Sequence, residues 1–110
     1  MNKEIMIQVG MVIGRIRNEL KNNNKNCDYE NFCRNLRLKL NKNKDYSSLI
    51  KLIIHYFEKV TRHIYLNDET FNERMHNILQ LTINDKHYKL NDEDITNIIC
   101  GISKFYVEEA

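Results

Sequence analysis

Apolar residues recur at helical spacing along most of the chain, and short polar segments divide this pattern into five stretches. The spacing predicts helices over residues 2–20, 28–40, 46–66, 69–81 and 92–108. The third stretch has the widest apolar face, so we expect it to lie at the centre of the core. The predicted fold class is therefore all-α: a single-domain bundle of about five helices over residues 1–110.

The same spacing predicts which face of each helix points inward. In the first helix, one side carries Ile5, Val9, Val12, Ile13, Ile16 and Leu20. In the last helix, the predicted inner face is formed by Ile95, Ile98, Ile99, Ile102 and Tyr106.

Helix starts are marked by side chains that can accept hydrogen bonds from free backbone N–H groups. Asp45 and Asp68 stand before the third and fourth helices, and Asn91 stands before the fifth with an acid three residues later. Between the fourth and fifth helices, apolar residues alternate around Asn84 and Asp85, a pair suited to a tight turn. This pattern predicts a short β-hairpin over residues 81–90, with continued helix or coil as the alternatives.

Composition bounds the class of protein. The chain of 110 residues has 42% hydrophobic residues, no proline and three glycines, which favours one small helical domain. Its three cysteines are an odd number, so a reducing, cytoplasmic setting is favoured over a disulfide framework. The apolar run at residues 5–14 is too short to span a membrane and continues in helical register, so we expect neither a signal peptide nor a membrane segment.

Residue types that could bind a metal do not form a recognised motif. Cys27 and Cys33 stand six residues apart, unlike the close pairs of structural zinc sites. Glu73 and His76 make a single Glu-x-x-His pair, whereas di-iron bundles need two. The usual catalytic signatures are missing as well. We therefore expect no cofactor, no metal and no enzymatic activity.

Charge is divided unevenly along the chain. Residues 1–66 carry 13 bases and 6 acids, a net charge of +7, whereas residues 67–110 carry 4 bases and 9 acids, a net charge of −5. The candidate nucleic-acid contacts are Arg34, Arg37, Lys39, Lys42 and Lys44. The candidate contacts to a protein partner are Asp68, Glu69, Glu73, Asp92, Glu93 and Asp94. Helix capping and solvation are the simpler explanations for both sets.

Two of the three glycines, Gly10 and Gly14, fall on one flank of the first helix. Because each glycine costs about 1 kcal/mol relative to alanine in a helix, the pair indicates close approach of another backbone. Ile7 and Met11 lie nearby, opposite the predicted core face. The neighbour is either the last helix of the same chain, which we favour, or another chain in a dimer or partner complex.

These observations favour a non-catalytic interaction protein. The most concrete form of this hypothesis is a small cytoplasmic inhibitor or immunity-type protein that neutralises a toxin or effector, such as a nuclease, by covering its active site. The size, the missing catalytic motifs, the acidic second half and a composition typical of AT-rich genes all favour it. The alternative is a small nucleic-acid-binding transcriptional regulator that uses residues 34–44, with a homodimer formed through the first helix.

Overall fold

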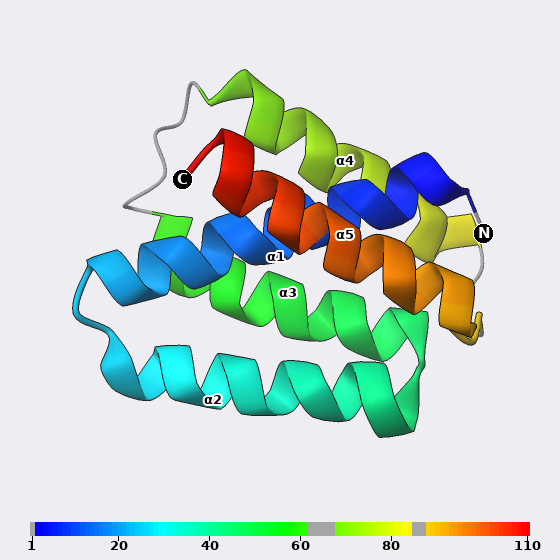
Figure 1. The fold of residues 1–110 in the computed structure, drawn as a ribbon, viewed down its shortest axis with the longest axis horizontal. Coiled ribbons are helices and arrows are strands. Elements are labelled where there is room, and N and C mark those ends of the chain that lie inside the picture. Colours follow the sequence, from blue (N-terminus) through cyan, green and yellow to red (C-terminus); the bar gives the residue numbers. More distant parts are fainter. Residues whose placement is uncertain (1, 62–67, 85–87) are drawn as a thin grey trace.

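Helices form in all five stretches where the sequence predicts them. The computed structural model describes residues 2–61, 68–84 and 88–110, and of residues 82–84 it describes the backbone only. Within these ranges there are five α-helices and no strand, which confirms the all-α class (Figure 1). Their bounds are α1 Lys3–Asn22, α2 Asn26–Leu38, α3 Tyr46–Val60, α4 Glu69–Asn84 and α5 Asp92–Glu108, with a π-helical turn, η1 Lys39–Asn43, after α2.

The central helix is α1, not the third helix that the sequence predicts. Each of the other four α-helices packs against α1, and α5 crosses directly in front of it in Figure 1. Because neighbours cover several of its faces, α1 is buried well beyond a single stripe. Its buried residues are Met6, Val9, Gly10, Met11, Val12, Ile13, Gly14, Ile16 and Leu20. Ile5, at the end of the predicted stripe, is only half-buried.

All three glycines lie where α1 crosses α5. A Cβ atom on Gly10 would stand 2.7 Å from the backbone nitrogen of Ile102 and 2.8 Å from the Cα of Gly101, and closer still to the carbonyl oxygen of Ile98. A Cβ on Gly101 would in turn meet the carbonyl oxygen of Ile7. The neighbour that Gly10 requires is therefore the last helix of the same chain, and the missing side chains allow the two backbones to touch.

This contact shifts the inner face of α5 from the one that the sequence predicts. Of the predicted residues, Ile98 is buried, and Ile95 and Ile102 pack partly against the core. The buried residues of α5 are Asp94, Ile98, Gly101 and Phe105. Ile99, predicted to point inward, is 52% exposed, and Tyr106 is 37% exposed. Only backbone without a side chain fits against Gly10, so Gly101 faces α1, and Ile99 and Tyr106 are left on the outer side of α5.

The helix caps are as predicted. The backbone N–H groups of Ser48 and Phe71 donate to the carboxylates of Asp45 and Asp68, at 2.9 Å and 3.1 Å. Asn91 accepts from the backbone nitrogen of Asp94 at 2.8 Å, and Asp94 accepts from that of Asn91 at 3.1 Å, which completes a capping box.

The predicted hairpin is wrong. Helix α4 continues through Asn84, so residues 81–84 are helical, and the turn residues 85–87 lie outside the described residues. Beyond them, Lys89 pairs with Asp45 in an isolated antiparallel bridge, in which Tyr46 and Leu90 donate backbone hydrogen bonds to Tyr88 and Lys44. The alternating apolar residues that predicted the hairpin therefore belong to the end of α4 and to residues 88–90, which are hydrogen-bonded to the start of α3. Residues 62–66 of the predicted third helix also lie outside the described residues.

Candidate functional site

The six acidic residues that the sequence selects as partner contacts are not equivalent in the structure. Asp94 is only 2% exposed, and besides capping α5 it accepts a hydrogen bond from the Tyr88 hydroxyl at 2.6 Å. Asp68 caps α4 and also accepts from the Arg15 guanidinium at 2.8 Å. These two carboxylates therefore serve the fold, and the buried Asp94 is a poor contact for a partner.

The four exposed acids lie in two separate places. Glu69 and Glu73 lie in the first turns of α4, and Asp92 and Glu93 begin α5. Figure 1 shows that α4 and α5 run in opposite directions, so these two starts lie at opposite ends of the bundle. Since α4 has 16 residues, about 24 Å of helix separates the two ends. The structure therefore does not bring the predicted acidic patch together as one surface.

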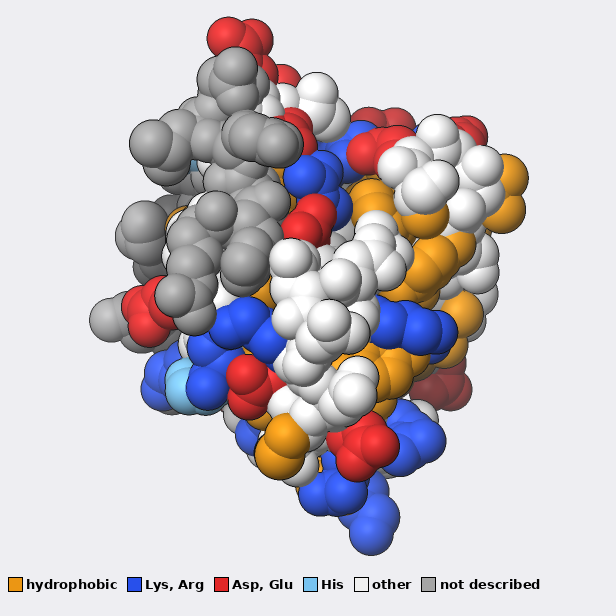
Figure 2. Space-filling model, turned by 90° about the vertical axis from the view of Figure 1, so that its left-hand side faces the viewer, with side chains coloured by type: hydrophobic (Ala, Val, Ile, Leu, Met, Phe, Trp, Pro, Cys, Tyr) orange, Lys and Arg blue, Asp and Glu red, His pale blue; other side chains and the backbone are white. Residues whose placement is uncertain are grey.

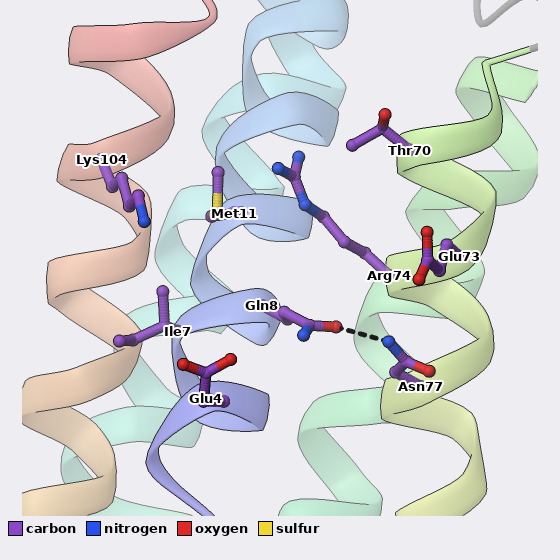
Figure 3. Close-up of a pocket in the computed structure, with 9 residues that line it drawn as sticks. All are labelled: Glu4, Ile7, Gln8, Met11, Thr70, Glu73, Arg74, Asn77 and Lys104. Atoms are coloured by element: carbon purple, nitrogen blue, oxygen red, sulfur yellow. Dashed lines mark hydrogen bonds between the residues drawn. The ribbon is translucent and has the colours of Figure 1, made fainter.

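A cleft of about 280 Å³ lies where α4 and α5 diverge over α1, and it is lined by two of the predicted flank residues of the first helix. Figure 3 shows Ile7 on the α5 side of this cleft, and Gln8 accepting from Asn77 of α4 at 2.9 Å. The charges that line it are mixed. Glu4 and Glu73 carry negative charge, and Lys104 and Arg74 carry positive charge.

These contacts leave little of the predicted flank available to another chain. Arg74 is fixed by two hydrogen bonds from its guanidinium to Glu109, at 3.0 Å and 2.9 Å. Met11 is buried, Gly10 and Gly14 are covered by α5, and Ile7 is half-buried. The predicted dimer face is therefore mostly internal.

The basic segment that the sequence predicts is accessible, but it is not one continuous patch. Arg34 and Arg37 are exposed on α2 and line a groove between α1 and α2. Lys42 is exposed in η1, and Lys39 is half-buried there. Lys44 follows η1 in the left-handed conformation, with φ of 53°, and lies 4.0 Å from a carboxylate oxygen of Asp92.

The groove between α1 and α2 has a volume of about 440 Å³ and contains a third arginine, Arg17, that sequence reasoning missed. Its other described lining residues are Tyr29, Glu30, Cys33, Arg34, Leu36 and Arg37. One of these is acidic and three of the seven are arginines, so the groove is basic. We call it the arginine groove.

Two tyrosines hold Arg17 in the arginine groove. The guanidinium carbon lies 5.9 Å from the ring centre of Tyr29 and 5.5 Å from that of Tyr106. Burial lowers the pKa of Arg17, but its interactions with Tyr29 and Tyr106 together raise that pKa above the ordinary value. For Tyr106, burial raises the pKa of the hydroxyl, and the nearby positive charge of Arg17 offsets part of this increase. Arg17 therefore remains charged.

An apolar stripe on α5 adjoins the arginine groove. Ile95, Ile99, Ile102 and Tyr106 follow one another at helical spacing, and we call this stripe the α5 flank. Ile95 and Ile102 are half-buried, whereas Ile99 and Tyr106 are exposed. The flank stays open because α5 packs chiefly on α1. On the right of Figure 2, where α5 lies, hydrophobic side chains form a band. Lysine and arginine side chains gather in the lower half of the same view.

Two surface features stand out among the described residues, the α5 flank and the arginine groove. In the described part of the chain, no three His, Cys, Asp or Glu side chains are grouped so that they could hold a metal ion. Among the helices described, none is both long and apolar enough to cross a membrane. The chemistry that the surface provides is an exposed apolar stripe that ends at a cluster of cations.

Comparison of the chain with protein-family models, curated proteins and solved structures finds no match.

Proposed function

We propose that the protein is a non-catalytic interaction protein of the inhibitor or immunity type, which neutralises a toxin or effector in the cytoplasm by covering its active site. The observation that supports this proposal is the α5 flank, an apolar helix face on which Ile99 and Tyr106 are exposed. Three free cysteines, two of them exposed, suit a reducing compartment.

The exposed part of α5 can contribute appreciable binding energy. Ile99 is 52% exposed, and Val107, on the outermost side of the same helix, is 84% exposed. Fully burying such a side chain is worth roughly 1.5–3 kcal/mol, so covering the exposed halves of several of them contributes about 1 kcal/mol each. A few residues commonly dominate the affinity of a protein interface, and tyrosine and arginine are enriched among them, which suits Tyr106 and the adjacent Arg17.

The α5 flank suits a partner better than the predicted acidic residues do. Glu69 and Asp92 lie at opposite ends of the bundle, so one active site cannot cover both of them (Figure 1). The α5 flank and the arginine groove, in contrast, meet at Tyr106 and form one continuous surface. We therefore propose this surface as the principal contact, with the exposed acids in a secondary role at its margins.

The test is to isolate the partner and measure what the protein does to it. A tagged protein is used to capture partners from the native source, and the activity of each captured enzyme, nucleases included, is assayed with and without added protein. We expect at least one partner whose activity falls as the protein approaches equimolar amounts. If every captured partner keeps its full activity at saturation, the inhibitor function is refuted.

Sedimentation of the purified protein separates this function from self-association. If the partner is a different protein, the purified protein alone should sediment as a monomer of 13.3 kDa. A stable homodimer that dissociates on Ile99→Asp substitution would instead show that a second copy covers the α5 flank, and it would count against the proposed role.

A second candidate function, nucleic-acid binding, is favoured by Arg34 and Arg37, which are exposed beside Arg17 in the arginine groove. Contact with phosphates predicts that affinity for labelled DNA or RNA falls steeply as salt rises, because bound counterions are released. Fluorescence anisotropy at low salt provides the test. The absence of binding there would remove this candidate.

A further inference from the structure

The three arginines of the arginine groove lack the salt bridges that the other described arginines form. Arg15 forms salt bridges with Glu19 and Asp68, and Arg74 forms one with Glu109. Among the described residues, no carboxylate forms a salt bridge with Arg17, Arg34 or Arg37. Three guanidinium groups therefore line one groove with a single acid, Glu30, and none of the three forms a salt bridge with a described carboxylate.

Arg17 is positioned in advance for an anionic group. It is half-buried, its guanidinium contacts the rings of Tyr29 and Tyr106, and its Nε atom is buried without a hydrogen-bond partner. Stacking on two rings restricts the side chain, so less conformational entropy is lost when an anion binds. Planar guanidinium groups match carboxylates and phosphates, which they bind through paired hydrogen bonds.

We propose that the arginine groove binds the carboxylates of an acidic segment of a partner protein, whose apolar residues cover the α5 flank. This inference rests on the proposed function and specifies the chemistry of the partner. Arg17 belongs to the arginine groove and Tyr106 to the α5 flank. The two parts of the site are adjacent, because the Arg17 guanidinium lies 5.5 Å from the centre of the Tyr106 ring. A segment that carries acidic residues beside leucine or isoleucine complements both halves at once.

Two features favour a protein segment over a nucleic acid. The ring of Tyr29 is already in contact with Arg17 and with Lys21, whose Nζ lies 5.8 Å from its centre, so it is occupied as a platform for a stacked base. The surface next to the groove is apolar, with Ile99 more than half exposed, and a phosphodiester backbone has nothing to cover it. Acidic amphipathic segments supply both the negative charge and the apolar side chains.

Three labelled probes test this inference even before the partner is identified. The first is a helical peptide with leucine on one face and glutamate on the other. The second is the same peptide with glutamine in place of glutamate, and the third is a short single-stranded oligonucleotide. We expect the glutamate peptide to bind most tightly and to lose affinity as salt rises, and we expect its binding to shift the NMR signals of the Arg17 side chain and of Ile99.

Variants show whether the arginine groove is responsible. We expect Arg34→Ala combined with Arg37→Ala to weaken binding of the glutamate peptide about tenfold, since two partly exposed ion pairs are lost. Lys3→Ala combined with Lys51→Ala removes the same charge from exposed positions away from the groove and should leave the affinity within about twofold. Arg17→Lys keeps the charge but loses the planar group, so it should weaken binding to an intermediate degree.

Several outcomes would overturn the inference. These are equal binding of the glutamate and glutamine peptides, no binding of the glutamate peptide at millimolar concentration, or tighter binding of the oligonucleotide that is lost in the Arg34/Arg37 variant. The proposed function fails separately. A captured enzyme that is inhibited equally well by wild type and by the Arg34/Arg37 variant would leave the inhibitor role in place and refute the acidic contact.

Discussion

The crossing of α1 and α5 allows the effect of a single methyl group to be predicted. In Gly10→Ala, the added Cβ would lie 2.7 Å from the Ile102 nitrogen and 2.8 Å from the Gly101 Cα, and it would also clash with the Ile98 carbonyl. These are all backbone atoms of α5, so the whole helix has to move. Overpacking of this kind costs up to about 3 kcal/mol. Alanine recovers about 1 kcal/mol of helix propensity, which leaves a net loss of about 2 kcal/mol.

Gly14→Ala is the matched control, because its neighbour is a side chain. The added Cβ would lie 2.8 Å to 3.0 Å from side-chain atoms of the buried Phe105, so one side chain has to shift, whereas Gly10→Ala requires the backbone of α5 to move. A smaller overpacking cost of about 1 kcal/mol is then offset by the gain in helix propensity, so we expect a change near zero.

Thermal denaturation and urea denaturation, both followed by circular dichroism, measure the stability of the two variants. For a domain of this size, a loss of about 2 kcal/mol lowers Tm by about 8 °C, and we expect that shift for Gly10→Ala alone. If Gly10→Ala is as stable as wild type or more so, the two backbones do not touch at Gly10, and the orientation that we assign to α5 is wrong.

Three further predictions concern the caps and the tyrosine beside Arg17. Asp94→Ala removes the capping box and the acceptor of the Tyr88 hydroxyl, and it should cost about 2 kcal/mol in urea denaturation, whereas Glu93→Ala next to it should cost little. Asp68→Ala should cost about 1–2 kcal/mol, and a double-mutant cycle with Arg15→Ala should show coupling between the two residues, because one carboxylate serves both the cap and the ion pair. Burial raises the pKa of Tyr106, so its contribution to stability is complete below pH 10 and is lost as pH rises through the raised value. The Tm of wild type should therefore fall relative to that of Tyr106→Phe only above about pH 10, and a constant difference in Tm across this range would contradict that assignment.

Local features of the fold could be predicted from the sequence because their causes are local. The caps at Asp45, Asp68 and Asn91 depend on residues three positions away, and helical spacing identifies the five helices. The orientation of α5 could not be predicted in this way. Apolarity favours burial of Ile99, whereas the close approach of Gly10 to Gly101 decides which face points inward, and this contact joins residues 91 positions apart.

In the candidate site, too, local features could be predicted from the sequence, and features that depend on distant contacts could not. Arg34 and Arg37 were predicted from charge, since they belong to one basic run. Arg17 was missed because it appears as one more base in the first helix, and its role depends on Tyr29 and Tyr106 from two other helices. The separation of the acidic residues could not be predicted either. Glu69 and Asp92 look alike as acids at helix starts, but the antiparallel course of α4 and α5 places them at opposite ends of the bundle (Figure 1).

The affinity of the captured partner for two variants tests the central claim that this partner covers the α5 flank. Ile99→Asp places a charge in the proposed interface, whereas Gln80→Asp adds the same charge at an exposed residue of α4. Calorimetry should show that Ile99→Asp weakens binding about a hundredfold or more, because a carboxylate is buried against apolar groups, while Gln80→Asp stays within about twofold of wild type. Wild-type affinity for Ile99→Asp in a folded protein would contradict the account.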